Sequence, residues 1–256
     1  MTWQVIGDTA RGITHLRSDK PNQDAWGFAQ SAHCTCLAVA DGHGSDKHYR
    51  SDIGAKIAVT TALELLQLFA EQPFEIRPIK QSADYLASKI VQAWRSGVDA
   101  ADQEQTPISQ RYSVYGTTLI AVLLTNDYVL YLQLGDGDLL ILDASGQVQR
   151  PLHRDAQLLA NETYSLGSED ALYHVEMELQ FFQYHPQPAF IFLATDGYAN
   201  SFADDFGLCQ AVQDFQTQIN SHGKQLIQSC LNEWLHETSE LGSGDDVTVA
   251  ILVREE

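Results

Sequence analysis

The sequence predicts an α+β fold in which antiparallel β-sheets and paired helices form stacked layers. Seven runs rich in β-branched, leucine and aromatic residues have the lengths of strands. Asn126-Asp127 and Asp143–Gly146 are hairpin-like turns between such runs, which indicates antiparallel pairing. Four amphipathic helical patterns occur as two sequence-adjacent pairs, and such pairs suit sheets that helices cover on one face.

The predicted strands contain the residue types that fit a pleated, buried surface. They are Cys34–Ala40, Thr117–Leu124, Tyr128–Leu134, Leu139–Leu142, Leu172–Phe182, Ala189–Ala194 and Val247–Val253. One more strand is expected to start at Trp26, soon after Asp24.

The predicted helices have apolar residues at every third or fourth position. The first pair covers Ile53–Phe69 and Leu86–Ala101, and the second covers Leu208–Ile219 and Leu226–Leu235. Neither a long linker nor an internal repeat divides the chain, so residues 1–256 are expected to form a single domain.

The charge balance disfavours some function classes. The chain has 34 Asp and Glu against 15 Lys and Arg, a formal net charge of −19. Such a chain repels nucleic-acid phosphates, so no nucleic-acid partner is expected.

The N-terminal residues do not resemble a signal peptide, and the apolar runs are too short to cross a bilayer. We therefore expect a cytoplasmic monomer with no membrane partner.

Aspartates recur at the ends of the predicted strands. Asp41, Asp136 and Asp196 follow strands, whereas Asp24 and Asp245 precede them. If these carboxylates gather in space, they repel one another and need cations to be stable. A single Asp-Gly pair is typical of an ordinary turn, but this recurrence in one structural context predicts a metal site.

The motifs around these aspartates occur in a definite order over nearly the whole chain. They are Asn22-Gln23-Asp24, Val39-Ala40-Asp41-Gly42-His43-Gly44, Tyr115-Gly116-Thr117-Thr118, Leu134-Gly135-Asp136, Ala194-Thr195-Asp196-Gly197 and Gly244-Asp245-Asp246-Val247-Thr248. The set resembles that of the phosphatase 2C-like, metal-dependent (PPM) phosphatases. The resemblance implies a four-layer α-β-β-α sandwich of two mainly antiparallel sheets flanked by helices, with metals at one edge.

The resemblance also implies metal ligands. Asp41 matches a carboxylate that bridges two ions, and Gly42 offers its carbonyl to one of them. Asp196 and Asp245 match ligands of the other ion, and Asp136 matches an acid at a third, weaker site. Oxygen-only ligands favour Mg²⁺ or Mn²⁺, so two or three such ions are expected.

Three further residues match catalytic positions. Asp24 resembles an acid that orients the attacking water, and His43 resembles the proposed general acid that protonates the leaving oxygen. Arg17 matches the phosphate-binding arginine, although it is displaced by an apparent two-residue insertion. Asp19 stands at the expected place, and Lys20 is an alternative cation.

The sequence departs from the family pattern at other positions as well. Gln23 replaces an acid found in many relatives, and Asp138 replaces a basic residue. A loop that many relatives insert, the flap, is expected to be short or absent between Arg154 and Leu172.

The expected function is metal-dependent hydrolysis of phosphoserine and phosphothreonine by activated water, with phosphorylated proteins as substrates and a cognate serine/threonine kinase system. A haloacid-dehalogenase-like phosphatase is disfavoured because a hairpin, not a helix, follows Asp136-Gly137-Asp138. An EF-hand at Asp41–Asp52 lacks the required ligand pattern. A catalytically weak or silent protein-binding relative stays open as an alternative, because of Gln23 and the displaced Arg17.

Overall fold

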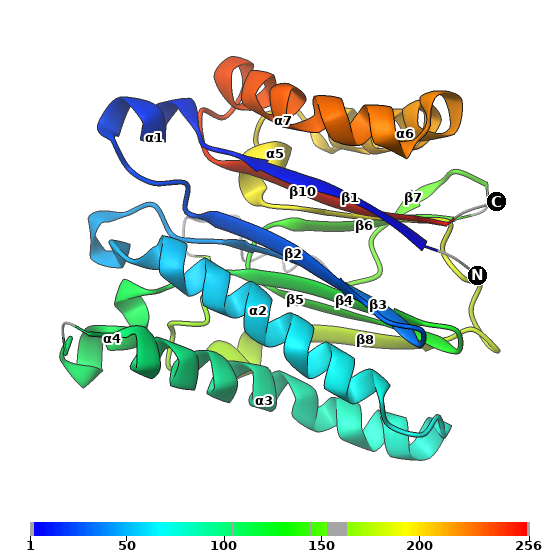
Figure 1. Ribbon diagram of the computed structural model, residues 1–256, viewed down its shortest axis with the longest axis horizontal. Coiled ribbons are helices and arrows are strands. Elements are labelled where there is room, and N and C mark those ends of the chain that lie inside the picture. Colours follow the sequence, from blue (N-terminus) through cyan, green and yellow to red (C-terminus); the bar gives the residue numbers. More distant parts are fainter. Residues whose placement is uncertain (1–2, 104, 144, 153–162, 255–256) are drawn as a thin grey trace.

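The computed structural model describes residues 3–103, 105–143, 145–152 and 163–254. Two five-stranded sheets lie face to face between two layers of helices (Figure 1). One outer layer is α6 (Asp205–His222) and α7 (Lys224–Leu241), and the other is α2 (Ser51–Ala70) and α3 (Ile76–Ala101). This arrangement confirms the predicted four-layer α-β-β-α sandwich.

The first sheet lies beneath α6 and α7 and has the strand order β1-β10-β9-β6-β7. All of its described pairings are antiparallel. Its strands are β1 (Trp3–Ala10), β6 (Asp138–Leu142), β7 (Val148–Gln149), β9 (Phe190–Ala194) and β10 (Val247–Arg254).

The second sheet packs against α2 and α3 and has the strand order β2-β3-β4-β5-β8. Its described pairings are also antiparallel. Its strands are β2 (Asp24–Gln30), β3 (Cys34–Asp41), β4 (Leu119–Thr125), β5 (Tyr128–Leu134) and β8 (Glu176–Phe181).

The core has three parts because each sheet buries both of its faces. Alternate residues of β3 show the division. Cys36 and Ala38 face the helices, whereas Leu37 and Val39 face the other sheet, and all four are fully buried. The third part lies between the first sheet and α6–α7. Burial on both faces explains why the central strands are continuous apolar runs rather than alternating ones.

Helix α2 lies on the second sheet with small residues at the contact. Ala55, Ala58 and Ala62 are fully buried there, and they let the helix approach the strands closely. Among the described residues, α2 is the one helix whose length and apolar composition would also allow it to cross a membrane. Its place between the sheet and α3 accounts for that composition (Figure 1).

The helix and strand bounds correct the sequence prediction in several places. The single strand predicted at Leu172–Phe182 is wrong, because a 3₁₀ turn at Ala171–His174 precedes β8. Helix α3 starts at Ile76 rather than at Leu86. The elements not predicted are β1, β7, α1 (Ile13–Ser18), α4 (Ile108–Val114), the short α5 (Asp196–Ala199) and a 3₁₀ helix at Asp46–His48.

These omissions have local causes. In β1, Gly7 interrupts the apolar pattern, but a Cβ at Gly7 would lie only 2.6 Å from the Trp26 ring, so packing requires the glycine. Both α1 and α4 are too short to show a helical period.

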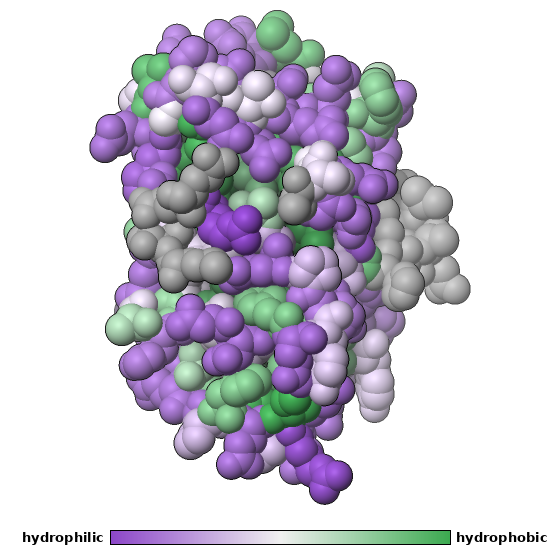
Figure 2. Space-filling view, turned by 90° about the vertical axis from the view of Figure 1, so that its right-hand side faces the viewer, coloured by the Kyte–Doolittle hydropathy of each residue, from purple (hydrophilic) through white to green (hydrophobic). Residues whose placement is uncertain are grey.

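The surface at one end of the molecule is largely hydrophilic (Figure 2). Figure 2 shows the end of the molecule where the termini lie, and hydrophilic residues dominate that face with hydrophobic residues between them. The loop between α1 and β2 lies at the opposite end (Figure 1). The acidic strand ends gather at that opposite end.

Candidate active site

Five strand-end aspartates come together where the two sheets meet. Asp24 and Asp41 are paired across β2 and β3 in the second sheet. Asp196 follows β9, Asp245 precedes β10, and Asp136 lies between β5 and β6. Asp24, Asp196 and Asp245 all act electrostatically on Asp41, and Asp136 and Asp245 act on Asp196. We call these five residues the carboxylate cluster.

The carboxylate cluster is unfavourable as a group of bare charges. Burial raises the pKa of Asp24, Asp41 and Asp196 above the ordinary aspartate value, and the neighbouring carboxylates raise it further. Asp41 also shares a hydrogen bond with Asp196. Divalent cations relieve this repulsion, so the donor set fits hard cations that take oxygen ligands.

Asp24 is held between the two sheets by hydroxyl groups. Thr195 Oγ1 and Thr248 Oγ1 donate to Asp24 Oδ2 over 2.7 and 2.6 Å. The Asp24 side chain is buried, and this oxygen already has two donors. The contacts suit a carboxylate that orients neighbouring groups, which is the role implied by the family resemblance.

The turn after Asp41 leaves no room for a side chain. A Cβ at Gly42 would lie 2.6 Å from the Gln23 carbonyl oxygen and 2.7 Å from that of Ser51. Thr117 Oγ1 donates to the Asp41 carbonyl over 2.8 Å, and the Asp41 amide donates to Thr118 Oγ1 over 3.0 Å. The Tyr-Gly-Thr-Thr motif therefore fixes the backbone that carries Asp41.

The other members of the carboxylate cluster have fewer fixed contacts. Asn200 Nδ2 donates to Asp196 Oδ2 over 3.0 Å, and Thr163 Oγ1 donates to Asp136 Oδ2. The Asp245 side chain is 54 % exposed, so it can turn toward a bound ion. Gly197 lets the turn carrying Asp196 approach β10, because a Cβ there would lie 2.0 Å from the Asp246 carbonyl oxygen.

His43 lies two residues after Asp41, in the loop that follows β3. Its ring is half-buried, and its centroid lies 4.9 Å from that of His48. Burial lowers the pKa of His43 to about 4, and His48 contributes to the shift. The His43 imidazole is therefore neutral near pH 7 in this arrangement.

The two candidate phosphate-binding cations lie in different surroundings. Arg17 is exposed in the last turn of α1, and it forms no ion pair or hydrogen bond within the described ranges. Lys20 Nζ instead donates to the Gly44 carbonyl over 2.8 Å and pairs with Asp46 at 3.3 Å. The structure thus places Lys20 against the loop that carries His43, and it does not join Arg17 to the carboxylate cluster.

Asp138 departs from the family pattern without leaving an isolated charge. Its side chain is 2 % exposed and pairs with Arg150 at 2.8 Å, and Arg150 also binds Asp205.

The predicted shortening of the flap falls largely on residues 153–162, which lie outside the described residues.

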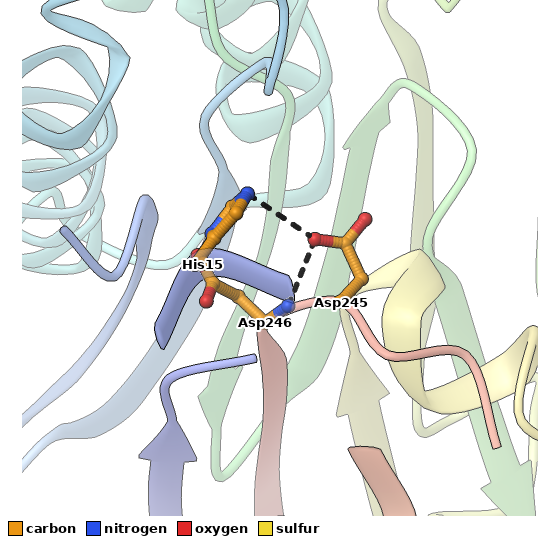
Figure 3. A group of neighbouring side chains, drawn as sticks. All are labelled: His15, Asp245 and Asp246. Carbon is orange, nitrogen blue, oxygen red and sulfur yellow. Dashed lines mark hydrogen bonds and ion pairs between the residues drawn. The ribbon is translucent and has the colours of Figure 1, made fainter. Parts of the chain in front are cut away.

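Sequence reasoning missed His15, which the structure places beside Asp245. His15 Nδ1 lies 2.8 Å from Asp246 Oδ2, and Nε2 lies 3.8 Å from Asp245 Oδ1 (Figure 3). Asp246 also accepts 2.6 Å hydrogen bonds from the amides of Gly12 and Gln23. Both Asp246 oxygens therefore already accept hydrogen bonds from the protein. His15 belongs to no motif, and α1 is too short to be predicted.

Gln23 stands where many relatives have an acid, and it is buried. Its Nε2 donates to Ser51 Oγ over 2.5 Å and to the His43 carbonyl over 3.3 Å. Its Oε1 is buried and accepts no hydrogen bond from the described residues.

Comparison with known proteins identifies the family. Residues 11–238 match the family described as Protein phosphatase 2C, which is most of the chain. The chain belongs to the protein phosphatase 2C family. It is 28 % identical over 203 residues to serine/threonine-protein phosphatase 3 of Escherichia coli (strain K12), covering 77 % of this chain and 74 % of that protein.

Solved structures show the same protein phosphatase 2C fold. PppA of Pseudomonas aeruginosa, described as a key regulatory component of T6SS, superposes with a TM-score of 0.66 at 20 % identity, covering 99 % of this chain and 98 % of that chain. The serine/threonine phosphatase Stp1 of Staphylococcus aureus superposes with a TM-score of 0.64 at 16 % identity, covering 100 % and 96 %.

Proposed function

We propose that this protein phosphatase 2C family member hydrolyses phosphoserine and phosphothreonine in proteins and requires Mg²⁺ or Mn²⁺. The carboxylate cluster is the observation that supports the proposal most strongly. It gathers acids from both sheets in an arrangement whose repulsion a divalent cation would relieve. Membership of the family and the name of the Escherichia coli relative support the same substrate class.

The chain offers ligands for two ions, or three with Asp136. Asp41 would bind two of them, the Gly42 carbonyl would bind one of these, and Asp196 and Asp245 would bind the other. When bound, such ions lower the pKa of a shared water and neutralise the phosphoryl oxygens. Asp24, fixed by Thr195 and Thr248, would hold the water in line with the phosphorus atom.

His43 is proposed to supply the proton for the leaving serine or threonine oxygen. Its position next to Asp41 and its half-buried ring favour this role. Its low pKa means that only a small fraction of the rings carries the proton at neutral pH, but a group with such a pKa is a strong acid once protonated. Lys20 is better placed than Arg17 to balance charge near the Gly44 loop.

The biological setting follows from the substrate class. Phosphorylated proteins would be the substrates, and a serine/threonine kinase system would supply them. We further propose that the protein works in the cytoplasm as a monomer, without membrane or nucleic-acid partners.

A catalytically silent binding module is the second candidate function. The neutral Gln23 and the exposed Arg17 favour it, whereas the presence of Asp41, Asp196 and Asp245 favours catalysis. Hydrolysis of p-nitrophenyl phosphate with Mn²⁺, measured against a chelator control, distinguishes the two. Metal-dependent turnover supports the enzyme, and Mn²⁺ binding without any turnover would support the silent module.

A further inference from the structure

His15 is a fixed imidazole at the border of the carboxylate cluster. Its side chain is 10 % exposed, and its Nδ1 lies 2.8 Å from Asp246 Oδ2. Asp246 is 4 % exposed and is itself held by the amides of Gly12 and Gln23. In the tautomer whose Nδ1–H donates to Asp246, the lone pair of His15 lies on Nε2.

Nε2 of His15 is directed toward Asp245. Figure 3 shows the ring on α1 facing the Asp245 carboxylate, with Nε2 3.8 Å from Oδ1. A histidine nitrogen and a carboxylate oxygen that bind one ion at about 2.0–2.2 Å lie roughly 3–4 Å apart. The observed separation is within that range.

Gln23 Oε1 provides a second, independent observation. This buried carbonyl oxygen has no hydrogen-bond partner among the described residues, and Gln23 is 5 % exposed. A Cβ built on Gly44 would lie 3.8 Å from Gln23 Oε1 and 3.8 Å from His15 Nε2. The two atoms thus border the same space beside Gly44.

The three atoms form an acceptor set with no donor of its own. Asp245 Oδ1, which accepts from the Asp246 amide over 2.9 Å, Gln23 Oε1 and, in the tautomer with the proton on Nδ1, His15 Nε2 all offer lone pairs. A phosphate group would be repelled by Asp245 and would receive no hydrogen bond from Gln23 Oε1. A cation is the ligand that satisfies all three atoms.

We propose that His15 Nε2 and Asp245 Oδ1, with Gln23 Oε1, bind a divalent cation, and that Asp246 is the positioning residue that orients the imidazole. A carboxylate–histidine pair is a common way to fix a metal-binding ring. A nitrogen ligand favours a transition-metal ion such as Mn²⁺ over Mg²⁺, which prefers oxygen. The inference rests on the proposed function insofar as this ion is one of the catalytic cations.

Electron spin echo spectroscopy of the full chain loaded with one equivalent of Mn²⁺ tests the assignment. The wild type should show coupling from a bound ¹⁴N nucleus, and labelling its histidines with ¹⁵N should replace that coupling by the ¹⁵N pattern. The coupling should disappear in His15→Ala and persist in His43→Ala, which removes the neighbouring imidazole. The labelled wild type needs no substitution, so absence of histidine coupling there overturns the proposal even if His15→Ala does not fold.

Affinity gives a second readout. Calorimetric titration of His15→Ala should show Mn²⁺ binding weakened by about 10–100-fold and Mg²⁺ binding changed much less. Absence of nitrogen coupling in the wild type, or its persistence in His15→Ala, would overturn the proposal. Phosphoserine peptide hydrolysis in the presence of Mn²⁺ is measured in parallel. Activity without nitrogen coupling would leave the proposed function intact while removing His15 from the metal site.

Discussion

Asp24 and Asp41 stand directly opposite each other in the β2–β3 ladder, at the point where both strands reach the edge of the sandwich. Backbone pairing within the second sheet therefore places the two carboxylates close together. Asp196 and Asp245 lie nearby at strand ends of the first sheet, and they raise the pKa of Asp41 further. Gathering these carboxylates lowers the electrostatic stability of the metal-free protein.

Asp41→Asn should stabilise the metal-free protein. Burial raises the pKa of Asp41 in the folded state, so the folded chain binds more protons than the unfolded chain, and stability falls as the pH rises through that raised pKa. Removing the charge should raise the melting temperature at pH 7 in chelator by about 2–4 °C, as expected for roughly 1 kcal/mol. Thermal unfolding measures this, with Asp214→Asn on the exposed face of α6 as control. A fall in melting temperature specific to Asp41→Asn would contradict the prediction.

Asp196→Asn and Asp245→Asn should each lower phosphatase activity by at least about 100-fold, because a metal ligand would lose its charge. Asp214→Asn should retain activity. Initial rates at saturating Mn²⁺ with p-nitrophenyl phosphate provide the measurement. If either variant kept normal rates, that residue would not be a metal ligand.

His43→Ala should slow phosphoserine peptide hydrolysis by about 10²–10⁴-fold and p-nitrophenyl phosphate hydrolysis much less. Nitrophenolate leaves without needing a proton, whereas a serine alkoxide needs one. Because the pKa of His43 is lowered to about 4, the peptide rate should gain from acidification relative to the nitrophenyl rate. Equal losses on the two substrates would instead indicate that His43 only shapes the loop after Asp41.

Gln23→Glu should tighten Mn²⁺ binding by roughly tenfold, since a charged oxygen would replace an amide oxygen that has no hydrogen-bond partner among the residues that the structure describes. The same change removes the amide donor to the His43 carbonyl and adds a charge near Asp246, so stability in chelator should fall. Titration of activity with Mn²⁺ at fixed substrate tests the first effect. Superimposable curves for the two proteins would show that Gln23 does not face an ion.

The sandwich was predictable where the sequence is periodic or strongly apolar. β3, β4, β5 and β10 are apolar runs, a short turn joins β4 to β5, and α6 and α7 keep a buried stripe on one side. β1 was missed because Gly7 looks like a break, although it makes room for Trp26. That requirement depends on a contact between the sheets, which no local pattern contains.

The carboxylate cluster was predictable from its strand-end positions, but its neighbours were not. Asp41 and Asp196 follow strands and sit beside glycines, so the sequence marks them. His15 is brought to Asp245 by a short helix and by a bond to Asp246, which lies 231 residues away in the chain. The orientation of the Gln23 amide, whose Oε1 has no hydrogen-bond partner among the described residues, is set by the bonds of its Nε2 to Ser51 and His43. Contacts between residues so far apart in the chain produce no recognisable motif in the sequence.

The most direct test of the central claim is phosphate release from a phosphoserine peptide by the wild type and by Asp41→Asn, with Mn²⁺ and after exhaustive chelation. Our account predicts turnover by the wild type with Mn²⁺, its loss in chelator, its recovery when Mn²⁺ is restored, and none by Asp41→Asn under any of these conditions. Undiminished turnover in chelator, or equal turnover by Asp41→Asn, would contradict it.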